Sequence, residues 1–241
     1  MNGFKLEMHL HTLGNSRCAK VSADRAAKIY ADAGYDGVVV TNHWNRNIAE
    51  NYFADSSDKI NEYLKGYYAM KATGIHTLFG VELALREDFY SPLNRRGAEI
   101  LVYGITAEEF REYGESLYRN SYDGLRRLAN DRGWLLYQAH PFRERSKRVP
   151  PEFLDGVEVY NGNPRHINAN AIAAIYAEKH RLKPSAGSDF HQAGDVKSGI
   201  CFRDKITDEK ALAAALSSDA FRIFKNIKKL KQVSEKAISE T

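Results

Sequence analysis

The chain has 241 residues, of which 43% are hydrophobic and 27% charged, which is ordinary for a soluble globular protein with one full hydrophobic core. Its 35 basic and 31 acidic residues give a formal net charge of +4, which weakly favours an anionic substrate and does not indicate nucleic-acid binding. Cys18 and Cys201 lie far apart, which argues against a disulfide framework, and the sequence has neither a signal-peptide core nor a membrane-spanning run. We expect a cytoplasmic protein without membrane contact, folded as a single domain over residues 1–241.

The residue pattern predicts strands that alternate with helices along most of the chain. The helices carry apolar residues at helical spacing, and in the last of them Ile172, Ile175 and Tyr176 form the expected core face. Short, mostly apolar strands in such an alternation predict a parallel sheet, closed or nearly closed by outer helices. In chain order, the predicted elements are a strand at 4–8, helix at 21–33, strand at 37–41, helix at 57–73, strands at 76–85 and 99–103, helix at 117–130, strands at 134–138 and 156–160, helix at 168–180 and strand at 183–186.

Two irregular segments and the end of the chain lie outside this alternation. Residues 42–56 and 86–98 each follow a candidate ligand, as substrate-binding loops do. From about residue 225 the chain is a basic amphipathic tail. We interpret the tail as a solvated final helix, with a functional basic patch as the alternative.

Histidines and carboxylates recur just after the apolar runs. His9 and His11 share one face of a strand because side chains two residues apart point the same way, so both can bind one metal. Parallel strands in a barrel present their carboxyl ends on one rim, where such residues converge. Imidazoles and carboxylates are ligands of divalent metals. The sequence therefore predicts a metal centre, with candidate ligands His9, His11, His43, Glu82, His140, Asp189 and His191.

These motifs together resemble a known family. The runs His9–Thr12, Thr41–His43, Gly80–Glu82, Ala139–Pro141 and Gly187–His191 are similar, in order, to the successive motifs of the polymerase-and-histidinol-phosphatase (PHP) superfamily of metal-dependent phosphoesterases. The resemblance covers about residues 5 to 203 and is greatest to small bacterial stand-alone members of the histidinol-phosphatase type. It implies a distorted seven-stranded (β/α) barrel with two or three divalent metals at the carboxyl ends of its strands. Zinc, manganese and iron all suit such ligands.

The resemblance also implies a role for each ligand. His9, His11 and Asp189 would hold one metal, and Glu82 would bridge it to a second metal that also takes His140. His43 and His191 would face the third site of trinuclear members.

The sequence departs from the family pattern at several positions. Asn42 replaces the usual aspartate of the second motif, and the acid before the first motif is Glu7 instead of the usual aspartate. Near the two further histidines of trinuclear members stand Glu99, which can bind a metal, and Arg17, which cannot. Beside Arg17, we expect Cys18 to be a small buried thiol, with metal ligation as the alternative. A two-metal centre is therefore at least as well supported as a three-metal centre.

The chemistry expected of such a site is hydrolysis of a phosphomonoester. Two metals about 3.5–4 Å apart generate a bridging hydroxide and stabilise the phosphoryl oxygens for in-line attack. His43 or His191 would then protonate the leaving group, since imidazole titrates near neutrality. Arg143 is the first candidate for binding the substrate phosphate, followed by Arg17 and Arg165. Asn161 and Asn163 either orient substrate or form a turn.

We therefore expect a metal-dependent phosphatase that acts on a small-molecule phosphate ester, such as histidinol phosphate, a sugar phosphate or a nucleoside phosphate. One alternative is a nuclease or other phosphodiesterase, although the basic residues are spread out rather than gathered in an aromatic-lined groove. The other is a metal-binding regulatory module that has lost catalysis through the changes at Arg17 and Asn42. The sequence does not specify the oligomeric state.

Overall fold

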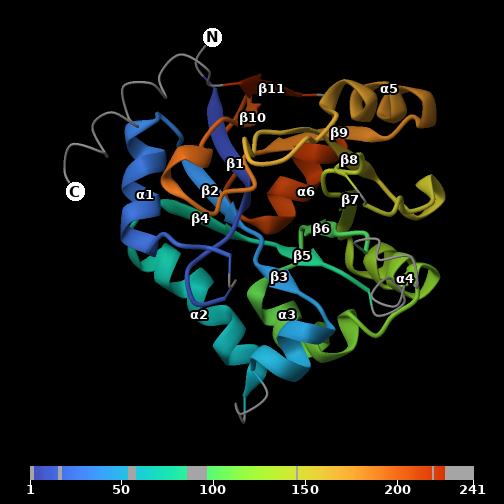
Figure 1. Cartoon of the computed structure of the whole chain (residues 1–241), viewed down its shortest axis with the longest axis horizontal. Helices are drawn as coiled ribbons and strands as arrows, with labels where there is room; N and C mark the ends of the chain where they lie inside the picture. Colours follow the sequence, from blue (N-terminus) through green and yellow to red (C-terminus); the bar gives the residue numbers. More distant parts are fainter. Residues whose placement is uncertain are drawn as a thin grey trace.

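The computed structural model describes residues 3–15, 18–53, 58–85, 97–144, 146–218 and 220–225. It is a mixed α/β fold in which helices surround centrally placed strands (Figure 1). The strands are β1 (Phe4–Leu10), β2 (Gly37–Val40), β3 (His43–Trp44), β4 (His76–Phe79), β5 (Val81–Leu83), β6 (Ile100–Tyr103), β7 (Leu135–Gln138), β8 (Gly156–Asn161), β9 (Lys183–Gly187), β10 (Ser198–Phe202) and β11 (Phe221–Lys225). The α-helices are α1 (Ala23–Asp32), α2 (Lys59–Ala72), α3 (Ala107–Leu117), α4 (Tyr122–Arg132), α5 (Asn170–His180) and α6 (Glu209–Ser217), and short helical turns cover Ile48–Tyr52, Pro151–Phe153 and Ala193–Asp195.

The strands pair as two sheets. The five-stranded sheet has the order β11-β10-β1-β2-β4, and the six-stranded sheet has the order β3-β5-β6-β7-β8-β9. The expected all-parallel arrangement is wrong, because β10 runs antiparallel to β1 and β11, and β6 runs antiparallel to β5 and β7. Between β6 and β7 the chain passes through α3 and α4 and returns at the same end of the sheet, so these neighbouring strands run in opposite directions.

The α/β class is confirmed, and every predicted strand and helix has a counterpart, but several elements differ. The described residues form eleven strands rather than about seven, because a break at Gly80 divides one predicted strand and β3, β10 and β11 were not predicted. The predicted helix at 117–130 corresponds to α4 alone, whose cap residue Ser121 accepts a hydrogen bond from the Gly124 amide. The helix α3, which begins with a capping box between Thr106 and Glu109, was not predicted. The helix α6 was also missed.

Two further predictions about helices are corrected by the structure. In α5, Ile172 and Ile175 are 53% and 66% exposed, whereas Ala173 and Ala177 are buried. The small alanine side chains let α5 lie close against β8, so the isoleucines do not form the core face. At the chain end, Lys225 belongs to β11 rather than to a helix, and the rest of the predicted tail lies outside the described residues.

The predicted loops have different outcomes. Residues 42–56 contain β3 and the turn Ile48–Tyr52, so this segment is more regular than expected. Most of the segment 86–98 lies outside the described residues. In the part of the chain that the structure covers, no helix is both long and apolar enough to cross a membrane.

An interior hydrophobic cluster joins the two sheets. It contains Met8 and Val39 from the first sheet, Leu101 and Tyr137 from the second, and Leu212 from α6, which lies behind the strands in Figure 1. A hydrogen bond of 3.1 Å from the Tyr103 hydroxyl to the Met8 carbonyl crosses the same interior. The larger cluster packs helices α1 to α4 against the outer faces of the strands. The inner faces of both sheets therefore meet, which brings the ends of their strands together.

The two sheets approach each other closely beside His9. A Cβ atom added at Gly187, at the end of β9, would lie 2.4 Å from His9 Cβ and 2.9 Å from the His9 amide nitrogen. An isolated parallel bridge between Leu10 and Phe190 continues the contact. The position thus requires glycine because the β1 backbone passes so close.

Substitution Gly187→Ala is expected to push β1 away from β9. Overpacking of this kind costs about 1–3 kcal/mol of unfolding free energy, and urea unfolding of the metal-free protein measures it. The matched control is Gly194→Ala, since a Cβ at Gly194 meets no atom within 4 Å. Equal stability of the two variants would contradict the close approach.

Candidate metal centre

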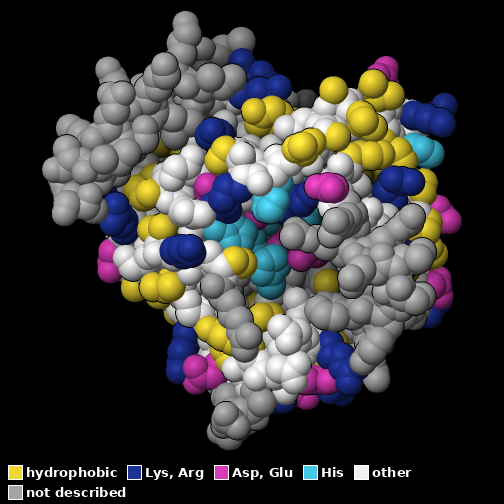
Figure 2. Space-filling view, viewed as in Figure 1, with side chains coloured by type: hydrophobic (Ala, Val, Ile, Leu, Met, Phe, Trp, Pro, Cys, Tyr) yellow, Lys and Arg dark blue, Asp and Glu magenta, His cyan; other side chains and the backbone are white. Residues whose placement is uncertain are grey.

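The strand ends place all seven candidate ligands in one region. His9 lies in β1 and His11 directly follows it, while the short strands β3 and β5 pair so that His43 lies opposite Glu82. The remaining ligands follow β7 and β9, and the histidine side chains gather in a hollow at the centre of one face (Figure 2).

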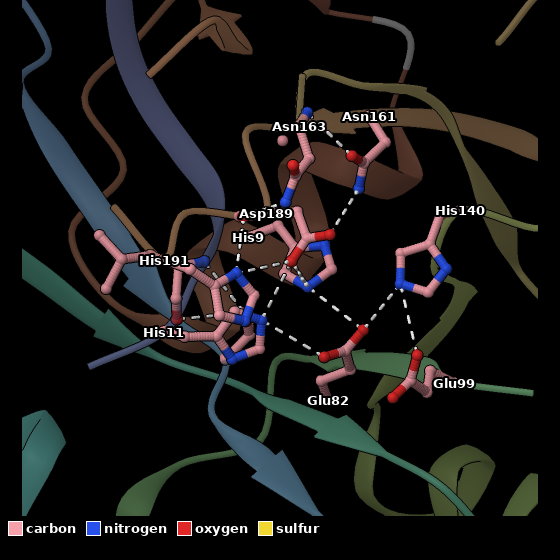
Figure 3. A network of polar contacts seen from close by, with 12 residues as sticks. His9, His11, Glu82, Glu99, His140, Asn161, Asn163, Asp189 and His191 are labelled. Atoms are coloured by element: carbon pink, nitrogen blue, oxygen red, sulfur yellow. Dashed lines mark hydrogen bonds and ion pairs between the residues drawn. The ribbon is translucent and has the colours of Figure 1, made fainter. Parts of the chain in front are cut away.

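Glu82 is the hub of this region. Its Oε1 atom lies 3.2 Å from Nε2 of His9 and 3.2 Å from Nε2 of His140. Its Oε2 atom lies 3.3 Å from Nε2 of His11 and 2.7 Å from Nδ1 of His43. Figure 3 shows the Glu82 carboxylate between the His9–His11 pair and His140. One buried carboxylate therefore contacts four imidazoles.

Among the described residues, three sets of side chains have ligand atoms that lie within 4.8 Å of one another. The sets are His9, His11 and Asp189; His43, Glu82 and Glu99; and His11, His43 and His191. In the set of His9, His11 and Asp189, Oδ1 of Asp189 lies 3.7 Å from Nε2 of His9 and 3.4 Å from Nε2 of His11. His43 belongs to two sets, one with Glu82 and the other with His191.

The residues fit divalent metals. Nε2 of His9, both ring nitrogens of His11 and Nδ1 of His140 are buried and have no hydrogen-bond partner among the described residues. Buried polar atoms are nearly always satisfied, and leaving them unsatisfied costs free energy. Nitrogen and carboxylate donors suit borderline divalent cations. A metal held beside Glu82 and Asp189 would satisfy Nε2 of His9 and Nε2 of His11 and would balance the carboxylates at once.

The backbone is strained at two candidate ligands. His140 has φ 28° and Asp189 has φ 50°, both in the left-handed region that non-glycine residues rarely adopt. Such conformations cost about 1–3 kcal/mol and persist where neighbouring contacts hold them. The His140 amide donates to Oε2 of Glu158 at 2.9 Å, and Nδ2 of Asn163 donates to the Asp189 carbonyl at 3.0 Å. The strain aims both side chains into the cluster.

The electrostatics of the cluster favour protons or cations. Burial opposes charge on His9, yet Glu82, Glu158 and Asp189 raise its pKa well above the usual value. Burial likewise opposes charge on His43, but Glu82 and the neighbouring Cys18 raise its pKa. For His11, burial and the nearby His191 and His43 lower the pKa well below the usual value.

The three predicted phosphate-binding arginines have different surroundings. Arg143 is buried, pairs through Nη2 with Oδ2 of Asp189 and donates from Nε to Oδ1 of Asn168 at 2.9 Å. Arg165 contacts both oxygens of Asp195 from Nη1, at 3.0 and 2.8 Å. Arg143 and Arg165 line a hollow of about 380 Å³ with His140 and His191, a volume suited to a small molecule. Arg17 lies outside the described residues.

Several polar residues around the cluster contact the candidate ligands, and of these Glu158 was not predicted from the sequence. Glu99 lies between two candidate ligands, with 3.6 Å from Oε1 to Nδ1 of His43 and 3.5 Å from Oε2 to Nε2 of His140. Glu158 and Asn161 are buried, and they contact His9 and Asp189 respectively. The one available signal for Glu158 is that it is the charged residue of β8, between Val157 and Val159. Figure 3 places Asn161 and Asn163 beside Asp189, so both hold a candidate ligand rather than only a turn.

Cys18 differs from the buried thiol that we expected. It is exposed, lines the same hollow, and its Sγ atom lies 3.8 Å from Nε2 of His43. Burial opposes ionisation of the thiol, but hydrogen bonds with His191 and His43 lower its pKa to about 5. A thiolate at the edge of the histidine cluster adds a further group able to bind a metal.

Metal binding is expected to release protons and to tighten as pH rises. The raised pKa values of His9 and His43 mean that both rings carry an extra proton near neutral pH, which a metal must displace. We expect about one proton to be released for each of these rings that binds the metal. The zinc dissociation constant should fall as the pH rises from about 6 to about 8. Calorimetric titrations in buffers of different ionisation enthalpy count the protons, and zinc binding without release would contradict the protonated rings.

Comparison with known proteins shows the fold. No family model matches the sequence, and no curated protein matches it. The structure is similar to the crystal structure of PsfC from Pseudomonas syringae, with a TM-score of 0.66 and 15% identity over 100% of this chain and 98% of that chain. It is also similar to a two-domain protein from Bacteroides vulgatus that contains a predicted PHP-like metal-dependent phosphoesterase, with a TM-score of 0.57 and 13% identity over 92% of this chain and 65% of that chain. At these identities, what the chain shares with both proteins is their fold.

Proposed function

We propose that this protein is a metal-dependent phosphoesterase of the PHP superfamily, and more specifically a phosphatase of the histidinol-phosphatase type that acts on a small phosphomonoester. The observation that carries the proposal is the buried Glu82 carboxylate in contact with His9, His11, His43 and His140. A carboxylate has two oxygens, so Glu82 can serve two metals while histidines complete each site. The similarity in fold to a protein that contains a predicted PHP-like phosphoesterase adds support.

We propose that the two sheets are parts of the distorted (β/α) barrel that the resemblance implies. The shared interior cluster and the bridge between Leu10 and Phe190 support this arrangement. The amide of Gly80 also donates to the Val40 carbonyl at 2.9 Å, which continues the pairing of β2 beyond β4. On this view the metal centre occupies the end of the barrel where β1, β7 and β9 finish.

The proposed ligands divide between two positions. His9, His11 and Asp189 hold the first, His140 and Glu99 contribute to the second, and Glu82 serves both. Metals bound there would activate water as the nucleophile and stabilise the negative charge on the phosphoryl oxygens. His43 contacts Glu82 and Glu99, and with His191 it offers a third position.

His191 is our first candidate for protonating the leaving group. Its Nδ1 atom lies 2.9 Å from the Asp189 carbonyl oxygen, which can only accept, so Nδ1 carries a proton and Nε2 is the exchanging atom. Burial disfavours the charged ring, but Cys18 and Asp189 raise the pKa of His191, which favours the protonated form that an acid needs. His43 is the second candidate, although Glu82 occupies its Nδ1 atom.

Phosphate release with and without metal tests the proposal. We expect the protein loaded with manganese or zinc to release phosphate from at least one small phosphomonoester, and a chelator to abolish the release. His140→Ala should lower both bound metal and activity by more than about 100-fold, beyond the effect of losing an outer partner of a ligand. Glu178→Gln serves as the control, because Glu178 is exposed. A metal-loaded protein without turnover on a broad phosphomonoester panel would contradict the phosphatase.

The phosphate-binding role of Arg143 is tested by product inhibition. A charge-assisted hydrogen bond contributes about 1.5–3 kcal/mol, so Arg143→Gln should weaken inhibition by inorganic phosphate about 10- to 100-fold. Bound metal, measured by elemental analysis, should stay constant. Arg203→Gln is the control, because the Arg203 side chain is 81% exposed. If metal content falls and the inhibition constant does not change, Arg143 supports Asp189 and does not bind phosphate.

A further inference from the structure

We infer that Glu158 is a positioning residue of the metal centre, which fixes the proton on the His9 ring and holds the strained backbone of His140. The inference rests on the proposed metal centre but not on its phosphatase activity. Glu158 is the third residue of β8 and is 1% exposed. It was absent from the candidate ligands because it does not follow a strand.

Both carboxylate oxygens of Glu158 have partners at the centre. Oε1 lies 3.1 Å from Nδ1 of His9. Oε2 accepts from the His140 amide at 2.9 Å and from Nδ2 of Asn161 at 2.8 Å. His9 belongs to the first proposed metal position and His140 to the second. One buried carboxylate therefore holds a ligand of each proposed metal position.

The contact with His9 decides which ring nitrogen can bind a metal. An ionised carboxylate only accepts hydrogen bonds, so Nδ1 of His9 must carry the proton that faces Glu158. The lone pair of the neutral ring is then on Nε2, the atom that lies 3.2 Å from Glu82 and 3.7 Å from Asp189. A carboxylate that holds the far nitrogen of a histidine ligand in this way fixes its tautomer and its orientation.

The contact with His140 holds an unfavourable backbone conformation. At φ 28° the residue lies in the left-handed region, and the amide that donates to Glu158 is its own. Asn161, the second donor to the same oxygen, also reaches Oδ2 of Asp189 at 3.4 Å. The Glu158 carboxylate thus holds His140 directly and contacts Asp189 through Asn161.

Glutamine at this position cannot make the same contacts. If its oxygen faces the His140 amide, its NH₂ group donates to Nδ1 of His9 and moves the ring proton to Nε2, where it blocks metal binding. If the amide is turned over, the NH₂ group faces two donors, the His140 amide and Asn161. Glu158→Gln is therefore nearly isosteric but disrupts one half of the arrangement in either orientation.

The first test uses zinc binding to the full chain, followed by competition with a chelator. We expect Glu158→Gln to raise the zinc dissociation constant about 10- to 100-fold, as loss of a partner of a ligand does. In ¹⁵N spectra of the zinc-loaded proteins, His9 should carry its proton on Nδ1 in the natural chain, and the variant should lose this signature. A zinc dissociation constant within about threefold of the natural chain's would overturn the inference, since outer partners contribute at least about tenfold.

The control is Glu7→Gln, which replaces an equally buried carboxyl group by an amide. Glu7 accepts from the backbone amides of His9 and Ser188 and from the Tyr30 hydroxyl, so its contact with His9 is to the backbone and not to the ring. The Nδ1 protonation of His9 should survive in this variant. An equal loss of the Nδ1 signature in both variants would mean that any buried carboxylate suffices, which would overturn the specific role.

The ring proton of the natural chain keeps the inference testable even if Glu158→Gln does not fold. A zinc-loaded natural protein whose His9 is protonated on Nε2, or on neither nitrogen, would overturn it. The proposed function fails separately: zinc binding that depends on Glu158, without phosphate release from any ester, would uphold the inference and reject the phosphatase.

Discussion

The burial of several carboxylates among imidazoles is the constraint on which the site depends. Glu82 and Asp189 are each about 1% exposed and lie in contact with histidine rings rather than water. Burial opposes ionisation of both, yet the neighbouring histidines lower their pKa values well below the usual range. A buried negative charge requires a compensating cation, which here is a proton on an imidazole or a metal between the side chains. The strained φ angles of His140 and Asp189 are understandable as the cost of bringing these groups together.

A layer of amides holds the charged groups in place. Asn168 accepts from Arg143 through its side-chain oxygen and donates to Oδ1 of Asn161 at 3.1 Å, while Asn163 holds the Asp189 carbonyl. These side chains are buried, and each makes more than one hydrogen bond. A buried amide without such partners would cost free energy. A connected network of this kind fixes positions more tightly than single contacts do. It follows that substitutions in the layer would disturb ligand geometry without removing any ligand.

The sequence placed the clustered histidines and carboxylates at strand ends more readily than it placed the layers around them, for a physical reason. His9 lies near the end of β1, and His11 and Asp189 lie within two residues of the ends of β1 and β9, and a strand and its terminal residues are local features of the sequence. Strand direction, by contrast, depends on how the chain returns, so β6 and β10 were not predicted as antiparallel. The exposure of Ile172 depends on how closely α5 approaches β8, and the role of Glu158 depends on a neighbour 149 residues away in the chain. Such features belong to tertiary packing and leave almost no local signal.

The distribution of positive charge bears on how an anionic substrate would bind. Arg143 is paired with Asp189 and Arg165 with Asp195, so each arginine at the hollow already faces a carboxylate. Asp195 also accepts from the backbone amides of His191 and Gln192, so its pairing with Arg165 fixes the segment that carries His191. Neither guanidinium can give its full charge to a phosphate without weakening one of these contacts. On the proposed function, the attraction for a phosphate dianion would therefore come mainly from the bound metals.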